Sequence, residues 1–224
     1  MKRMKHHACL IGAAILWLGC VRAMGQGSFV HVDAVDHVII SRGSPTVYYD
    51  IDMDQNGTVD FAFEAGSSFR IFSTVGNRSV AIPKGGNDLG SFSIPLGTGF
   101  EIGPSLAPNL YWIESQEYSP TDWIGQTLHF ADTSGTHGYW QPNMKAYLGV
   151  EFQIDGSEHY GWIGVETWWL TGVNGGTITD WAYNTVPGEM IFAGQVPEPS
   201  IWALLIAGGA FLWWKIRRGP SWTD

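Results

Sequence analysis

The stretch VYYDIDMDQNGTVDFAFEA, residues 47–65, decides the fold class. Apolar and polar residues alternate on both sides of Asn56-Gly57, and a period of two is typical of a β-strand with one buried face. An Asn-Gly pair between two such runs predicts a β-hairpin. The positions expected to face the core are Val47, Tyr49, Ile51, Val59, Phe61 and Phe63. The positions expected to face solvent together are Asp50, Asp52, Asp60 and Glu64.

Similar short runs follow along the rest of the chain. They predict strands at 29–40, 68–73, 78–82, 110–114, 126–130, 147–153, 160–169 and 176–184, and a last strand after Gly188. Short strands with glycine-rich turns and almost no helical periodicity indicate an all-β domain, an antiparallel β-sandwich or jelly roll over residues 28–195. Residues 83–108 are rich in glycine and proline, which favours a long surface loop with at most one short strand.

The hairpin also carries a pattern of oxygen-bearing residues. Asp52-x-Asp54-x-Asn56-Gly57 matches the start of an EF-hand calcium loop, in which the carbonyl of Thr58 and the carboxylate of Asp60 would follow as ligands. Position twelve is Phe63 rather than glutamate, and the flanks are predicted strands, so this is not a true EF-hand. Glu64 or Asp50 would complete the shell. The alternative is an Asp-rich hairpin turn that binds no metal.

Other groups of polar residues offer weaker candidates. Two acidic groups have the composition of a glycosidase carboxylate pair, namely Glu114 with Glu117, and Glu151 with Asp155 and Glu158. A second metal set would be His31, Asp33, Asp36 and His37, although these residues also suit the outer face of a first strand. His159 has no identifiable nucleophile or acid partner beside it in the sequence, so we interpret it as structural.

Tryptophans are frequent enough to form a sugar-stacking platform or to fill the core. The candidates are Trp112, Trp123, Trp140, Trp168 and Trp169. Adjacent strand residues face opposite sides, so either Trp168 or Trp169 is expected outside the core. Trp162 is expected inside the core, where Gly161 allows close packing.

The N-terminal residues have the three parts of a secretory signal peptide. A basic start (Lys2, Arg3, Lys5) precedes the apolar run Ala8–Val21 and the small residues of a cleavage site near Ala23. We predict a signal peptide at 1–25; the alternatives are a membrane anchor or a lipoprotein acylated at Cys20. Cys9 and Cys20 are the only cysteines, so the exported part is expected to contain no disulfide.

The predicted exported part is strongly acidic. Residues 28–196 hold five basic and nineteen acidic side chains. Such a surface repels nucleic acid and anionic lipid and attracts divalent cations, so we expect no nucleic-acid partner.

The C-terminal residues combine an apolar run with flanks that suit a membrane. Ile201–Trp214 contains no charge, and a helix of this length, about 21 Å, is short for a hydrocarbon core of roughly 30 Å. Pro197 and Pro199 prevent the helix from extending backwards. Interfacial tryptophans and a basic end favour one transmembrane helix over a buried core helix: Trp202, Trp213, Trp214, Lys215, Arg217 and Arg218.

This order of features resembles a known sorting signal. Val-Pro-Glu-Pro-Ser, an apolar run and a basic cluster within residues 196–218 resemble the PEP-CTERM signal of bacterial exported proteins. The resemblance implies that a membrane peptidase, an exosortase, recognises Pro197, Glu198 and Pro199 and processes the tail. It also implies passage from the inner membrane to the cell surface or to an extracellular polysaccharide matrix. A second resemblance, through HYGW (159–162) and WAYNT (181–185), is to uncharacterised exported bacterial proteins and implies no activity.

Together these observations predict an exported, non-enzymatic surface or matrix protein that is anchored through its tail. The first alternative is a carbohydrate-binding module, and the second is a glycoside hydrolase.

Overall fold

The computed structural model describes residues 29–41, 45–74, 76–83, 91–114, 125–132, 135–170 and 173–196, together with 209, 211 and 213. Its body is built from β-strands, which confirms the all-β prediction. The predicted signal peptide and most of the predicted sorting segment lie outside the described residues. Within the described part, none of the helical residues forms a helix with the length and apolar character needed to cross a membrane.

The described strands largely match the predicted runs. They are β1 (Phe29–Ser41), β2 (Val47–Ile51), β3 (Phe61–Ala65), β4 (Phe69–Ser73), β5 (Arg78–Pro83), β6 (Ser91–Ser93), β7 (Glu101–Ile102), β8 (Tyr111–Ile113), β9 (Gln126–Asp132), β10 (Gly135–Gly138), β11 (Lys145–Ile154), β12 (Ser157–Leu170), β13 (Val173–Asn184) and β14 (Ile191–Phe192). The predicted hairpin is present, because β2 pairs with β3 and Ile51 lies opposite Phe61.

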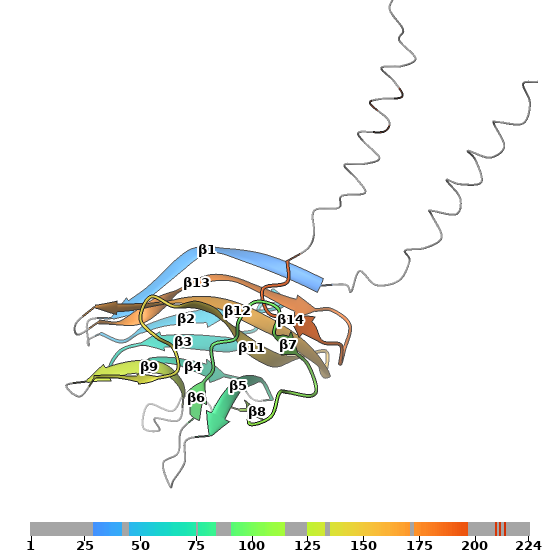
Figure 1. Ribbon diagram of the computed structural model, residues 1–224. Helices are drawn as coiled ribbons and strands as arrows, with labels where there is room; N and C mark the ends of the chain where they lie inside the picture. Colours follow the sequence, from blue (N-terminus) through green and yellow to red (C-terminus); the bar gives the residue numbers. More distant parts are fainter. Residues whose placement is uncertain are drawn as a thin grey trace, which may run out of the picture.

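Twelve of these strands form one curled sheet (Figure 1). Its order is β1-β13-β12-β11-β5-β6-β9-β4-β3-β2, with β10 paired to β9 and β8 paired to β5. All pairs are antiparallel except β6 with β9, and β7 pairs with β14 separately. The two end strands approach each other, because the His37 ring of β1 stacks on Tyr49 of β2 at 3.8 Å between centroids. The two halves of one sheet therefore enclose a shared interior.

The main core fills that interior. The alternation read from the hairpin holds for Ile51, Phe61 and Phe63, which are fully buried, while Tyr49 packs against them from the edge. Other large buried members come from neighbouring and facing strands and, for Trp140, from the segment before β11: Ile39, Phe69, Ile71, Leu128, Trp140, Leu148, Val150, Phe152, Ile163, Val165, Ile178, Trp181 and Tyr183. Each large side chain buried there stabilises the fold by about 1.5–3 kcal/mol relative to exposure.

A second core corrects the expectation of a surface loop at 83–108. This segment contains β6 and β7, and Leu96 pairs with Tyr147 of β11. Leu96 and Ile102 are buried against Trp162 and neighbouring side chains of the sheet. Gly149 makes the close approach possible, because a Cβ there would lie 2.7 Å from a methyl of Val80 and 3.0 Å from Leu96.

One end of the body gathers several features. Phe29, at the start of β1, pairs with Asn184 at the end of β13, and Gly161 pairs with Tyr183 nearby. The loop between β2 and β3 reaches the same place, since Met53 packs against Gly161. Figure 1 shows the start of β1 and the segment around β14 at this end. We call it the terminal end of the body.

Candidate metal centre

The loop between β2 and β3, residues 52–60, is ordered by hydrogen bonds to its own carboxylates. Asp52 accepts hydrogen bonds from the backbone N–H groups of Asn56 (3.1 Å) and Gly57 (2.6 Å). Asp54 accepts from the Asn56 backbone N–H (3.2 Å) and side-chain amide (2.9 Å). Gly57 has a φ of 92°, a conformation that glycine adopts without strain. The turn therefore fixes both carboxylates near its centre.

Three of the predicted ligands come together in this loop. Asp52, Asp54 and Asp60 each offer one carboxylate oxygen, and these oxygens lie within 4.8 Å of one another. Three carboxylates at this spacing offer a hard, oxygen-rich environment of the kind that calcium prefers. The other two predicted ligands, Asn56 and Thr58, bond to each other: the Thr58 N–H donates to the Asn56 side-chain oxygen at 2.8 Å. Their coordination of a metal stays a prediction.

Asp60 is not on the solvent face, contrary to the sequence-based expectation. Only 6% of its surface is exposed. It lies just before β3, and its carboxylate turns inward to accept hydrogen bonds from the Met53 backbone N–H (2.8 Å) and the Asn77 side-chain amide (3.1 Å). These two bonds tie the loop to the segment before β5.

The environment of Asp60 disfavours its charge. The pKa of Asp60 is raised to about 6: burial is the largest cause, the charges of Asp54 and Asp52 add to the rise, and the hydrogen bonds from Met53 and Asn77 oppose it. No described lysine or arginine is among the groups that shift this pKa. A bound divalent cation would supply the missing positive charge.

Glu64 and Asp50 do not complete the site, which corrects a second expectation. Strand register places Glu64 opposite Tyr48 on β2 and opposite Arg70 on β4, and Glu64 is buried rather than exposed. Burial raises the pKa of Glu64, and the charge of Arg70 lowers it. Asp50 is exposed opposite Ala62. Neither residue belongs to the acidic group of the loop.

Asn77 belongs to the site but could not be found from the sequence. It lies seventeen positions beyond Asp60, and no motif joins them. Its side-chain amide donates both to the Asp60 carboxylate and to the Asp60 backbone oxygen, at 3.1 and 3.3 Å. Its own oxygen accepts from the Gln153 backbone N–H at 3.1 Å, which links the loop to β11.

The glycosidase candidates separate into different environments. Arg78 donates to Glu151 through Nε at 2.6 Å and through Nη2, and the same Nη2 lies 3.4 Å from Glu158. Glu151 and Glu158 are therefore close together but share one guanidinium. Asp155 lies at the turn between β11 and β12, and the Glu114 carboxylate accepts from the Gly76 backbone N–H. Glu117 lies outside the described residues.

The second metal set does not form within the described residues. His31 binds Asp180 on β13, with 3.1 Å between Nε2 and Oδ2. His37 stacks on Tyr49, and Asp36 occupies a left-handed conformation with a φ of 42°. No group of potential ligands that includes His31, Asp33, Asp36 or His37 comes close enough to hold a metal.

The described tryptophans do not form a row of exposed rings. Trp140 and Trp162 are fully buried, and Trp112 is partly buried with its Nε1–H bonded to the Gly103 oxygen. Trp168 is 38% exposed, so one of the adjacent pair lies outside the core, as predicted. Its Nε1–H donates to Thr177 at 2.7 Å, which fixes the ring against β13. Trp123 and the side chain of Trp169 lie outside the described residues.

Comparisons with known proteins give no match: no family model, no curated protein and no solved structure matches this chain.

Proposed function

We propose that this chain is an exported, non-enzymatic protein of the cell surface or the extracellular matrix, with a body stiffened by a calcium ion at Asp52, Asp54 and Asp60. The observation that carries the calcium site is the buried Asp60 carboxylate, which has two acidic neighbours and no described basic partner. Asn56 and Thr58 would supply further oxygens. Proteins stabilise such acid groups either by protonation or with a metal ion.

The location of the loop gives this ion a mechanical role. Loop 52–60 lies at the terminal end of the body, where β1 begins and where the chain leaves β14 toward the tail. A cation there would hold the β2–β3 loop to Asn77 and, through Asn77, to β11. We propose that it stiffens the end of the β-sandwich through which a membrane tether pulls.

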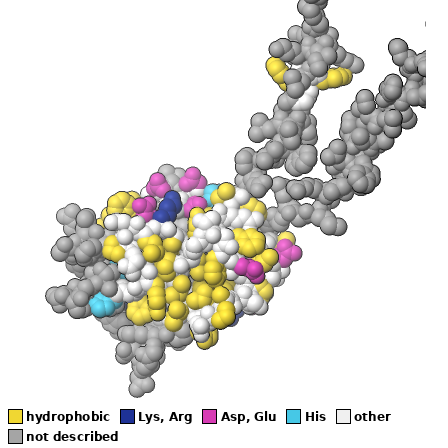
Figure 2. Space-filling model, in the orientation of Figure 1, with side chains coloured by type: hydrophobic (Ala, Val, Ile, Leu, Met, Phe, Trp, Pro, Cys, Tyr) yellow, Lys and Arg dark blue, Asp and Glu magenta, His cyan; other side chains and the backbone are white. Residues whose placement is uncertain are grey.

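The C-terminal residues carry the proposed sorting signal. In this proposal, the helix within 196–218 anchors the exported protein in the inner membrane, and an exosortase-type peptidase recognises Pro197, Glu198 and Pro199. Release then delivers the body to the surface or to extracellular polysaccharide. The acidic surface supports a role without nucleic acid; Figure 2 shows acidic side chains along the margin of one face, around a central apolar area.

Replacement of the sorting motif tests whether it is needed for release from the membrane. Changing Pro197, Glu198 and Pro199 together to alanine is expected to leave the full-length protein in the membrane fraction, because the peptidase loses its recognition sequence. The control is Val186→Ala, a substitution at an exposed residue upstream of the signal. Equal release of the triple variant and the control would contradict the proposed signal.

A carbohydrate-binding module is the second candidate. The exposed Trp168 ring supports this candidate. Its hydrogen bond to Thr177 already fixes the ring, so the ring loses less conformational entropy when a sugar stacks on it. We propose no hydrolase role, because the Arg78 guanidinium already pairs with both Glu151 and Glu158, the two described members of the candidate carboxylate pair that lie together.

A further inference from the structure

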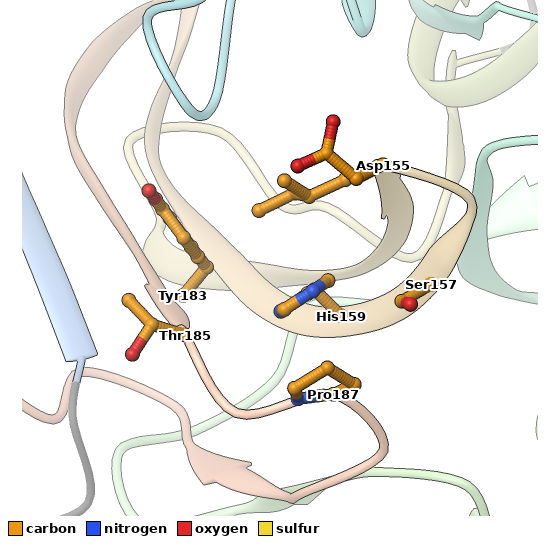
Figure 3. Close-up of a pocket in the computed structure, with 7 residues that line it drawn as sticks. Asp155, Ser157, His159, Tyr183, Thr185 and Pro187 are labelled. Carbon is orange, nitrogen blue, oxygen red and sulfur yellow. The ribbon is translucent and has the colours of Figure 1, made fainter.

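A hollow on the terminal end of the body is lined by residues other than those of the acidic loop. Its volume is about 400 Å³, and it is lined by Ile154, Asp155, Ser157, His159, Tyr183, Thr185 and Pro187. The lining comes from the β11–β12 hairpin, from the end of β13 and from the turn that follows it. Figure 3 shows the His159 ring in the wall between Tyr183 and Ser157. A hollow of this size is in the range that holds small ligands.

His159 is held rigidly in that wall. Its ring is only 4% exposed, and its Nδ1 lies 2.9 Å from the backbone oxygen of Asn184. A carbonyl oxygen can only accept, so Nδ1 carries the hydrogen. In the neutral ring Nε2 is then an acceptor, and no described residue bonds to it. The buried ring therefore offers one hydrogen-bond acceptor, Nε2, in a fixed orientation.

Neighbouring polar groups are also available. The described residues make no hydrogen bond to the Ser157 hydroxyl, the Asp155 carboxylate or the Tyr183 hydroxyl. Asp155 sits at the β11–β12 turn with a φ of 51° and is one of the residues that line the hollow. Together with Nε2 of His159, these groups can accept several hydrogen bonds from one ligand.

The charge and the apolar surface of the hollow limit the kind of ligand. No lysine or arginine is among its described lining residues, and Asp155 contributes a carboxylate. This negative surrounding disfavours anions. Ile154, Pro187 and the Tyr183 ring add apolar contact area. A ligand with many hydroxyl groups, apolar C–H faces and no negative charge satisfies all of these conditions.

We propose that this hollow binds a neutral sugar residue, with hydroxyl groups donating to His159 Nε2 and Asp155 and bonding to the hydroxyl of Ser157. The site is distinct from the acidic loop and does not depend on a bound cation. It is also distinct from the Trp168 ring, which lies on the outer surface of β12.

Amide chemical shifts of the full chain in detergent micelles test the site. The probes are cellotriose, maltotriose and chitotriose at concentrations on the order of 10 mM, which detect weak sites, in excess chelator. We expect one of them to shift the backbone amides of Ser157, His159 and Thr185 at saturation. Asp155→Asn combined with Ser157→Ala should weaken that sugar about tenfold, because two hydrogen bonds are lost or reduced. Asparagine tolerates the left-handed turn at 155, so the fold should persist.

Two controls make the result decisive. Glu189→Gln removes an exposed charge just beyond the turn and should leave the affinity unchanged. Tetramethylammonium, a cation without hydroxyl groups, should produce no saturable shift at the hollow. Three results would overturn the proposal: no shift with any sugar, shifts centred on Trp168, or shifts at the hollow with tetramethylammonium but with no sugar.

Discussion

Asp60 and Glu151 are two buried carboxylates that the protein treats in opposite ways. Glu151, 1% exposed, receives two contacts from the Arg78 guanidinium, so its charge has a partner within the chain. Asp60 receives hydrogen bonds from Met53 and Asn77 but faces two further acids. Burial raises the pKa of both carboxylates, and only Glu151 has a cation that opposes this rise. Glu151, which has a cation within the chain, is a structural acid. Asp60, which has no described cation beside it, is suited to bind an external ion.

Removing the cation from the Glu151 site should have the largest effect. Arg78→Met leaves a buried carboxylate without its partner, and such changes cost about 3–5 kcal/mol. The free energy of unfolding from urea titration should fall by that amount. Adding Glu151→Met should restore most of the loss, because no uncompensated charge then remains. If the single variant were as stable as the parent, the bridge would be a surface pair of little value.

His129 extends the comparison to a buried base without any partner. It is 2% exposed, and neither ring nitrogen has a hydrogen bond to a described residue. Burial lowers the pKa of His129 from 6.5 to about 4. Between these values the unfolded chain binds a proton that the folded chain does not, so stability falls as the pH drops from about 6.5 to 4. The loss should approach about 3 kcal/mol.

The variant His129→Leu should remove this acid-side loss. The measurement is the urea midpoint at pH 7, 5.5 and 4.5, compared with the parent protein. A parent-like decline in the variant would show that other groups bind the proton.

Calcium should stabilise the Asp60 site by a similar or smaller amount. An ion that binds only the folded state adds RT ln(1 + [L]/Kd), about 2.7 kcal/mol at a hundredfold excess over Kd. Asp52→Asn with Asp54→Asn should abolish the gain, while the amide oxygens can still accept the loop hydrogen bonds at Asn56 and Gly57. The measurement is thermal unfolding in millimolar calcium and in excess chelator.

The control for calcium is Asp50→Asn, which removes an exposed acid from the adjacent strand and should keep the full gain. Equal midpoints for the parent protein in both buffers would reject the site and leave an Asp-rich hairpin turn.

The smallest expected effect is the pH dependence of Asp60 in chelator. The folded pKa is raised to about 6, so the protonated form stabilises the fold below pH 3.8, and this contribution is lost as the pH rises through 6. This pH dependence of stability has the opposite sign to that of His129. The hydrogen bonds that Asp60 accepts from Met53 and Asn77 make it smaller. In the His129→Leu background, stability in chelator should therefore rise slightly from pH 7 to pH 4.5. Adding Asp60→Asn should reduce that rise, and the part that remains belongs to other buried acids such as Glu64 and Glu151, whose pKa values burial also raises. An undiminished rise would contradict the assignment to Asp60.

Much of the fold could be predicted from patterns among residues that lie close together in the sequence. The period of two in residues 47–65 predicted the β2–β3 hairpin and the burial of Ile51, Phe61 and Phe63, because side-chain alternation is a property of the strand itself. The spacing of Asp52, Asp54 and Asp60 predicted that their carboxylates meet, because all three lie in one short loop. The same alternation predicted that either Trp168 or Trp169 lies outside the core, and the structure shows that Trp168 does.

The same reasoning failed where a residue's partner lies far away in the sequence. Asp60 and Glu64 were expected on the surface, but Asn77 and Arg70 lie on other elements and draw them inward. Residues 83–108 resembled a loop, but Leu96 and Ile102 pack over Gly149 of β11. Composition cannot distinguish a glycine-rich loop from a segment that packs against a glycine in a distant strand.

The sequence by itself determined the all-β class, the hairpin, the acidic loop and the charge of the body, because each depends on neighbours within about a dozen positions. Only the tertiary structure decided that one sheet curls on itself, that Arg78 belongs to Glu151, and that Asp60 is buried without a described basic partner. It alone placed His159, Asp155 and Tyr183 around one hollow. The physical reason is that burial, and with it the free energy of each charge, is set by strands that meet across long stretches of chain.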